Sequence, residues 1–130
     1  MSEDRARLDA LPATYPRVFP RGLVMPWGFE VEAGWSQLLE TLCARLDTLL
    51  QESPGASIEI LQVKEKFGGL RFYYSLDGAD DATAEAISQA VDLAEATSEQ
   101  ICERCGRPGE IQSRRGWLRT RCAVCQADDP

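Results

Sequence analysis

Histidine is absent from the 130 residues of this protein. Without an imidazole, the chain cannot build Ser-His-Asp or Cys-His hydrolase sites, zinc deaminase sites or any His-ligated metal centre. Long apolar runs are also missing, since no segment approaches the roughly 20 residues that a membrane-spanning helix needs. The first four residues (MSED) are acidic and no apolar segment follows them. We therefore expect no signal peptide and no membrane anchor, and we place the protein in the cytoplasm.

Basic residues are fewer than acidic ones, 14 against 21, which gives a net charge of −7. The imbalance is concentrated in residues 1–100, where eight Lys and Arg stand against seventeen Asp and Glu, a net −9. Residues 101–130 hold six Arg against four acidic residues, a net +2. An acidic surface repels nucleic acid and anionic lipid and favours a basic partner. The sequence therefore predicts an acidic body that carries a small basic module.

Apolar residues make up 44% of the chain, enough for one hydrophobic core. Apolar spacing of three and four residues predicts a helix over residues 35–51, and a narrower Ala-rich stripe predicts a second helix over 82–100. Residues 58–63 and 70–76 have strand character, and Gly68-Gly69 between them suits a tight hairpin turn. The fold class predicted is α+β, with two helices packed on a small β-hairpin or sheet.

Three segments follow from these patterns. Residues 1–34 contain four prolines and predict an extended arm that docks on the body, the alternative being an arm that enters a partner's groove. Residues 35–100 form the α+β body. Residues 101–130 form a four-cysteine zinc-binding module of the ribbon or knuckle type.

Four of the five cysteines are spaced as two C-x2-C pairs separated by sixteen residues: Cys102, Cys105, Cys122 and Cys125. This spacing is typical of a structural Zn²⁺ site, because two such turns supply four thiolates at tetrahedral corners. A thioredoxin-like redox pair and an iron–sulfur cluster are alternatives, but the chain shows no βαβ unit and no ferredoxin spacing. A catalytic zinc is disfavoured since four Cys ligands leave no open position. Cys43 lies on the apolar stripe of the first predicted helix, and we assign it to the core.

Between the cysteine pairs, residues 111–120 predict a β-hairpin that turns at residues 114–116 (RRG). Six arginines lie in or beside this segment: Arg104, Arg107, Arg114, Arg115, Arg119 and Arg121. They suit two roles, as counterions for the thiolates and the acidic body, or as a nucleic-acid patch.

The stretch VKEKFGGLRFYY (residues 63–74), followed by an Ala/Glu-rich helix and a CxxCG…GW…CxxC tail, resembles a family of small bacterial and phage proteins. The segment PWGFEVEAGW (residues 26–35) is similar to the N-terminal part of that family. The resemblance covers roughly residues 26–125. It implies a prokaryotic or prophage setting and a zinc-bearing tail, and it supplies no substrate.

Charged and aromatic side chains outside the cysteine module are candidate contacts to a partner. The basic hairpin residues suit phosphate groups and its aromatic residues suit stacking, although Glu65 makes the patch mixed and an ordinary solvated hairpin face is the alternative. The acidic pairs suit a basic partner, or serve as turn and solubility residues. The candidates are Glu30, Glu32, Lys64, Lys66, Phe67, Arg71, Tyr73, Asp80 and Asp81.

We expect a protein that is not an enzyme, since no nucleophile or base orienter accompanies the carboxylate pairs. The function predicted is a zinc-stabilised protein-binding module, of the inhibitor or immunity type that neutralises a bacterial toxin or another protein with a basic surface. The alternative is a zinc-ribbon regulatory protein of bacterial or phage origin that associates with nucleic acid through the ribbon arginines.

Overall fold

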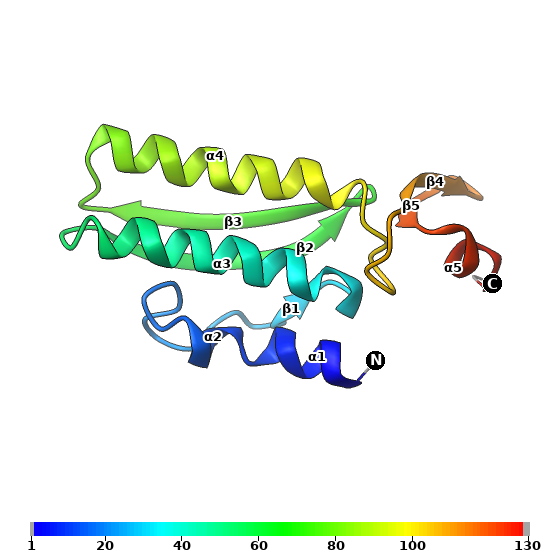
Figure 1. Ribbon diagram of the computed structural model, residues 1–130, viewed down its shortest axis with the longest axis horizontal. Coiled ribbons are helices and arrows are strands. Elements are labelled where there is room, and N and C mark those ends of the chain that lie inside the picture. The colour runs from blue at the N-terminus through cyan, green and yellow to red at the C-terminus, as the bar shows by residue number, and fades with distance from the viewer. Residues whose placement is uncertain (1, 129–130) are drawn as a thin grey trace.

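The computed structural model describes residues 2–128. Two long helices cover one face of a three-stranded sheet, and a second, two-stranded sheet lies at one end of the molecule beside the C-terminus (Figure 1). The elements in chain order are α1 (Ser2–Asp9), α2 (Leu11–Thr14), β1 (Phe29–Glu30), the 3₁₀ turn η1 (Ala33–Trp35), α3 (Ser36–Gln51), β2 (Ser57–Lys66), β3 (Gly69–Asp77), α4 (Asp81–Ser98), β4 (Glu110–Arg114), β5 (Trp117–Arg121) and α5 (Ala123–Asp128). The predicted α+β class is confirmed.

The helix α3 buries the apolar stripe that its sequence predicts. Leu39 and Leu46 are fully buried, and Trp35 in the preceding 3₁₀ turn is buried with them. Cys43 lies in the same core, where burial raises the pKa of its thiol to about 12. A thiol that stays protonated at neutral pH is a poor nucleophile and a poor metal ligand. Cys43 is therefore a core residue, as its position on the apolar stripe predicts.

The strands β2 and β3 form the antiparallel hairpin, with Lys64 opposite Arg71. The turn differs from the one expected from Gly68-Gly69. Its two residues with positive φ are Phe67 (54°) and Gly68 (85°), because Lys66 pairs with Gly69 and leaves only two residues for the loop. The Glu65 carboxylate accepts a hydrogen bond from the Gly68 N–H at 2.8 Å and holds this turn in place.

A third strand, β1, pairs parallel to β2, with Phe29 opposite Val63. Two residues of alternating burial give too little pattern to predict a strand from the sequence. This pairing draws the segment before α3 into the sheet, and so brings the residues that follow β1 to the end of the molecule where the cysteines lie (Figure 1).

The N-cap of helix α4 is Asp80, whose carboxylate accepts a hydrogen bond from the Thr83 N–H at 2.8 Å. The side chains of α4 also cover the outer edge of β3. The Glu95 carboxylate accepts from the Phe72 N–H at 2.9 Å, and the Ser98 hydroxyl accepts from the Leu70 N–H at 2.9 Å. These bonds satisfy edge-strand donors that would otherwise be open to pairing with another chain.

In the N-terminal segment, for which the prolines predict an extended arm, α1 and α2 occupy most of residues 2–14. Pro12 is accommodated because it lies in the first turn of α2, where a helix does not need its N–H. The segment lies against the body through the buried Leu8, Leu11 and Val18. No helix within residues 2–128 has both the length and the apolar character needed to cross a membrane.

Candidate metal centre

The four paired cysteines converge at the end of the molecule where the second sheet lies. Their sulfurs all lie within 4.8 Å of one another, with three of the residues buried and Cys105 exposed. All four are free thiols, and the Cys105 and Cys122 sulfurs are 3.5 Å apart, well beyond the roughly 2.05 Å of a disulfide bond. Four sulfurs at this separation could hold a metal ion.

Each cysteine pair sits on a tight turn that is closed by a hydrogen bond from a backbone N–H group. In the first pair, the Gly106 N–H donates to the Cys102 carbonyl at 2.8 Å, and Gly106 takes a φ of 84° that glycine adopts without strain. In the second pair, the Cys125 N–H donates to the Cys122 sulfur at 3.4 Å within the first turn of α5. These turns follow from the C-x2-C spacing.

The thiols of the cluster have opposite shifts in pKa. The Cys125 N–H donor lowers the pKa of Cys122, whereas burial raises the pKa of Cys125 and of Cys105. Thiolates this close repel one another, so the cluster cannot ionise completely without a positive charge among the sulfurs. A divalent cation supplies that charge and makes all four sulfurs thiolates.

The hairpin of β4 and β5 links the two cysteine pairs. It turns at Arg115 and Gly116, whose φ angles are 54° and 80°, within the three-residue turn that the sequence predicts. The hairpin also contacts the body, because the Thr120 hydroxyl donates to the Gly68 carbonyl at 2.6 Å. Thr120 is fully buried at this contact, so the tip of the β2–β3 hairpin and the second sheet form one packed junction.

The first cysteine turn is docked on the 3₁₀ turn before α3. The Gly34 N–H donates to the Glu103 carbonyl at 2.7 Å, and the Trp35 indole N–H donates to the Ile101 carbonyl at 3.0 Å. Any Cβ at position 34 would collide with the Cys102 and Glu103 carbonyl oxygens, so only glycine permits this approach. The Gly34-Trp35 pair therefore joins the cysteine module to the core of the body.

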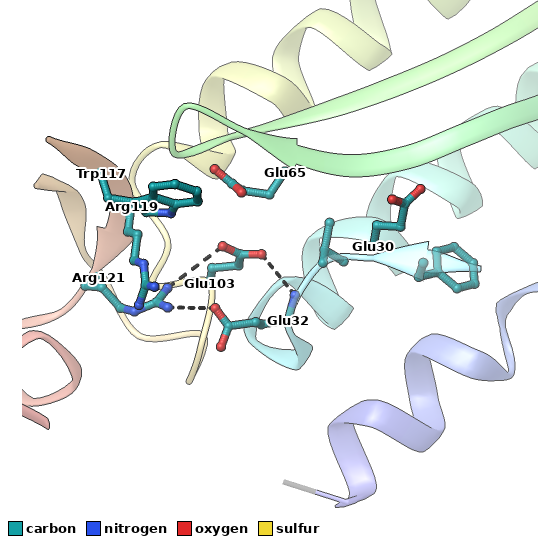
Figure 2. Close-up of a pocket in the computed structure, with 9 residues that line it drawn as sticks. Glu30, Glu32, Glu65, Glu103, Trp117, Arg119 and Arg121 are labelled. Carbon is teal, nitrogen blue, oxygen red and sulfur yellow. Dashed lines mark hydrogen bonds and ion pairs between the residues drawn. The ribbon is translucent and has the colours of Figure 1, made fainter. Parts of the chain in front are cut away.

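An ion-pair cluster completes the junction, with Arg121 and Glu103 buried and Glu32 exposed (Figure 2). An Arg121 guanidinium nitrogen lies 2.7 Å from a Glu32 carboxylate oxygen, and another lies 3.8 Å from a Glu103 carboxylate oxygen. Glu103 also accepts a hydrogen bond from the Glu32 N–H at 3.0 Å. Burial raises the pKa of Glu103 to about 7, against the opposing effects of the Glu32 N–H and of Arg121. We call Glu32, Glu103 and Arg121 the clamp.

The clamp borders a hollow of about 460 Å³, which Glu30, Glu65 and Trp117 also line (Figure 2). Each carboxylate around it has a partner in the protein. Glu30 accepts from the Gln62 side-chain amide at 2.9 Å, Glu65 accepts from the hairpin turn, and the other two belong to the clamp. The hollow thus lies between the body and the cysteine module, and the clamp carboxylates Glu32 and Glu103 hold the two together.

The structure brings some of the predicted contact residues together and separates others. Lys64, Arg71 and Tyr73 lie on the sheet face away from the helices, with Glu30 beside Lys64 in the register of β1 and β2. Lys66 lies over the Phe67 ring, 5.5 Å from its centroid, at the hairpin tip. Glu32 belongs to the clamp, while Asp80 and Asp81 begin α4 at the opposite end of the sheet (Figure 1). These residues do not form one continuous patch.

Glu103 is the site residue that sequence reasoning did not single out. The sequence did contain a signal, because the first cysteine of each pair has a charged neighbour, and the two neighbours have opposite charges. Glu103 follows Cys102 and Arg121 precedes Cys122. Closing the two pairs around one ion brings these charges together.

No protein-family model matches the chain, and the comparisons with curated proteins and with solved structures found no match. The resemblance to small bacterial and phage proteins therefore stays a prediction from the sequence motifs.

Proposed function

We propose that this protein is a non-enzymatic binding module, stabilised by Zn²⁺, that acts on a protein partner with a basic surface. An immunity or inhibitor protein that neutralises a toxin is the biological role that we infer. Toxins with anionic substrates carry basic sites, and an acidic inhibitor associates with such sites rapidly.

The donor set of the cysteine cluster supports zinc as its metal. Four thiolates suit Zn²⁺, whose Zn–S bonds of about 2.3 Å place ligand sulfurs roughly 3.8 Å apart in a tetrahedron. The four sulfurs within 4.8 Å match that spacing closely enough for small side-chain rotations to complete it. Bound there, Zn²⁺ would supply folding free energy to the module, and its filled ligand shell would leave no position for a substrate.

The hydrogen bonding of the hollow beside the clamp supports a non-enzymatic role. A general acid or base must be available to a reacting group, but all four carboxylates around the hollow hold backbone or side-chain groups of the protein itself. The contacts of Glu30 and Glu65 serve the sheet and its hairpin turn, and those of Glu32 and Glu103 serve the junction between the body and the cysteine module.

The choice of a basic protein as the partner rests on the acidity of α4 and of the residues on either side of it. Residues 72–103 contain eight Asp and Glu and no Lys or Arg. Several of these acidic side chains are exposed along α4, among them Asp81, Glu85 and Asp92. One element with a single sign of charge attracts a basic protein surface and repels phosphate backbones.

The runner-up function, nucleic-acid binding by the module, rests on the exposed Arg107 after the first cysteine pair and on the exposed Arg115 and Trp117 at the hairpin tip. Other arginines of the module serve the fold. Arg121 is buried in the clamp, and Arg114 donates to the Gln126 carbonyl at 3.2 Å. This use of the arginines favours their role as counterions.

The test is affinity capture with the tagged, zinc-loaded protein from the cells that encode it, with and without nuclease. We expect a protein that is captured in stoichiometric amounts with or without nuclease, and an association rate that falls as salt increases. Capture that depends on nucleic acid would establish the runner-up instead. An association rate that is independent of salt would remove the electrostatic part of the proposal.

A further inference from the structure

A shallow apolar groove of about 500 Å³ runs between α3 and α4. Its apolar lining comes from both helices: Leu38, Leu42, Ala86, Ala90, Leu93 and Ala94. The stripes of α3 and α4 that are buried against the sheet, such as Leu39 and Ile87, point elsewhere, so the groove lies on the outer side of the helix pair. Leu93, a large apolar residue at the rim of the groove, is 68% exposed.

An acidic stripe runs along the solvent side of α4, about 100° around the helix from Leu93 at the rim of the groove. Asp81, Glu85 and Asp92 are spaced four and seven residues apart, which places them within about 40° of one another around the helix. All three are exposed, and Asp92 directly precedes Leu93. The helix contains no Lys or Arg that would neutralise the stripe from its own surface.

We propose that this groove is the docking surface for an amphipathic helix of the partner protein, whose apolar face covers Leu93 and whose Lys and Arg side chains pair with the acidic stripe. This inference rests on the proposed function and identifies the surface through which the protein would bind its partner. A helix laid in a groove between two helices buries side chains spaced three and four residues apart, and the alanines at Ala86 and Ala90 leave room for its approach. Long basic side chains reach from the flank of such a helix to the neighbouring stripe.

A second copy of this chain fits the groove less well. Symmetric packing of α4 against α4 would bring two acidic stripes together, and like charges at close range oppose association. Arg45, from α3, also lines the groove, but each chain adds only this one positive charge against the three acidic residues of its own stripe. A basic helix removes this repulsion and gains attraction from the same residues.

The direct test uses an 18-residue amphipathic peptide of Leu and Lys, titrated into the ¹⁵N-labelled, zinc-loaded full-length protein. We expect amide shift changes centred on the α3–α4 groove, and no binding of the Leu and Glu peptide of the same pattern. Shift changes centred on the sheet face or on the cysteine module would overturn the assignment, as would the absence of binding at millimolar peptide.

A matched pair of variants separates apolar docking from general attraction. Leu93→Glu adds a negative charge, which by itself would strengthen the attraction of a basic peptide. We nevertheless expect affinity about tenfold or more lower, because a buried leucine contact is lost. Leu61→Glu makes the same change at a 49% exposed leucine of the sheet, and we expect it to bind the peptide as tightly as the unaltered protein. Equal losses in both variants would overturn the proposal. Circular dichroism checks that each is folded.

The partner protein from the capture experiment distinguishes the two proposals. If Leu93→Glu binds that partner with unchanged affinity, the docking surface is wrong and the proposed function remains. If no partner is captured, the proposed function fails while the peptide titration still decides what the groove binds. A homodimer of the unaltered protein in sedimentation experiments that Leu93→Glu dissociates would assign the groove to a second copy, against the proposal.

Discussion

The body and the cysteine module are held together by different forces. The body buries a continuous apolar core that draws on α1, α3, α4 and the sheet, with Trp35, Leu46 and Val63 fully buried. In the module, the buried apolar cluster within residues 2–128 consists of Cys102, Cys122 and Cys125 alone. A short segment with so small a core needs another source of folding free energy, and here the four thiols offer a metal site.

The module is packed on the body along one junction. It meets the body through backbone and buried polar contacts: Gly34 and Trp35 at the first cysteine turn, Thr120 at the β2–β3 turn, and the clamp between them. Such contacts depend on both partners being ordered. We therefore expect loss of the metal to loosen the junction, whereas the apolar core of the body persists.

The largest expected effect comes from removing a metal ligand. Replacing Cys102 or Cys125 with Ser should abolish tight zinc binding and unfold the module, because structural zinc contributes roughly 10–16 kcal/mol of apparent binding free energy in small zinc domains. Metal analysis and hydrogen exchange measure the two outcomes, and we expect fast exchange over residues 101–128 while α3 stays protected. Cys43→Ser is the control and should keep one zinc per chain. An apo protein whose module is fully protected would contradict the prediction.

The next largest effect concerns the clamp. Arg121→Met leaves Glu103 buried without its cation. Removing one partner of a buried ion pair costs at most about 3–5 kcal/mol, and less here because burial already raises the pKa of Glu103 to about 7 and lets the carboxylate take up a proton. We expect a lower thermal midpoint and faster exchange at the Gly34 and Thr120 junctions. The double variant Arg121→Met, Glu103→Leu removes both charges and should recover part of the loss. A double variant less stable than Arg121→Met alone would show that the pair itself does not account for the cost.

A smaller effect is expected at the contact between the 3₁₀ turn and the first cysteine turn. Gly34→Ala places a Cβ against the Cys102 and Glu103 carbonyls, and overpacking of this kind costs about 1–3 kcal/mol. Exchange at the module should rise while the zinc content stays at one per chain. Gly55→Ala is the control, since the nearest atom that its Cβ would meet is 3.8 Å away. Equal destabilisation by both variants would contradict the role assigned to Gly34.

The helices, the hairpin and the cysteine cluster were predictable because each has a local signal. Apolar spacing marks α3, and paired C-x2-C motifs mark the metal centre wherever the rest of the chain lies. The junction was not predictable, because it joins residues far apart in the sequence: Glu32 meets Arg121, and Gly34 meets Glu103. The two-residue strand β1, which delivers Glu32 and Gly34 to that place, carries no periodicity of its own. Tertiary pairing, and not local propensity, determines it.

The smallest effect is expected at the Asp80 cap of α4, which belongs to the body alone. Its size tests whether the body is stabilised independently of the module. The Thr83 N–H bond lowers the pKa of Asp80, so the ionised cap stabilises α4 at neutral pH. Because the folded-state pKa is below the unfolded value, this stabilisation is present above the unfolded pKa near 3.9 and is lost as the pH falls through the folded pKa.

Asp80→Asn keeps a capping oxygen without the charge. We expect its thermal midpoint to lie slightly below that of the unaltered protein at pH 6, and the two to converge in acid. The comparison is made in the Cys102→Ser background, so that acid release of zinc does not contribute. A difference that persists unchanged at pH 2.5 would show that the charge of Asp80 is not what stabilises the start of α4.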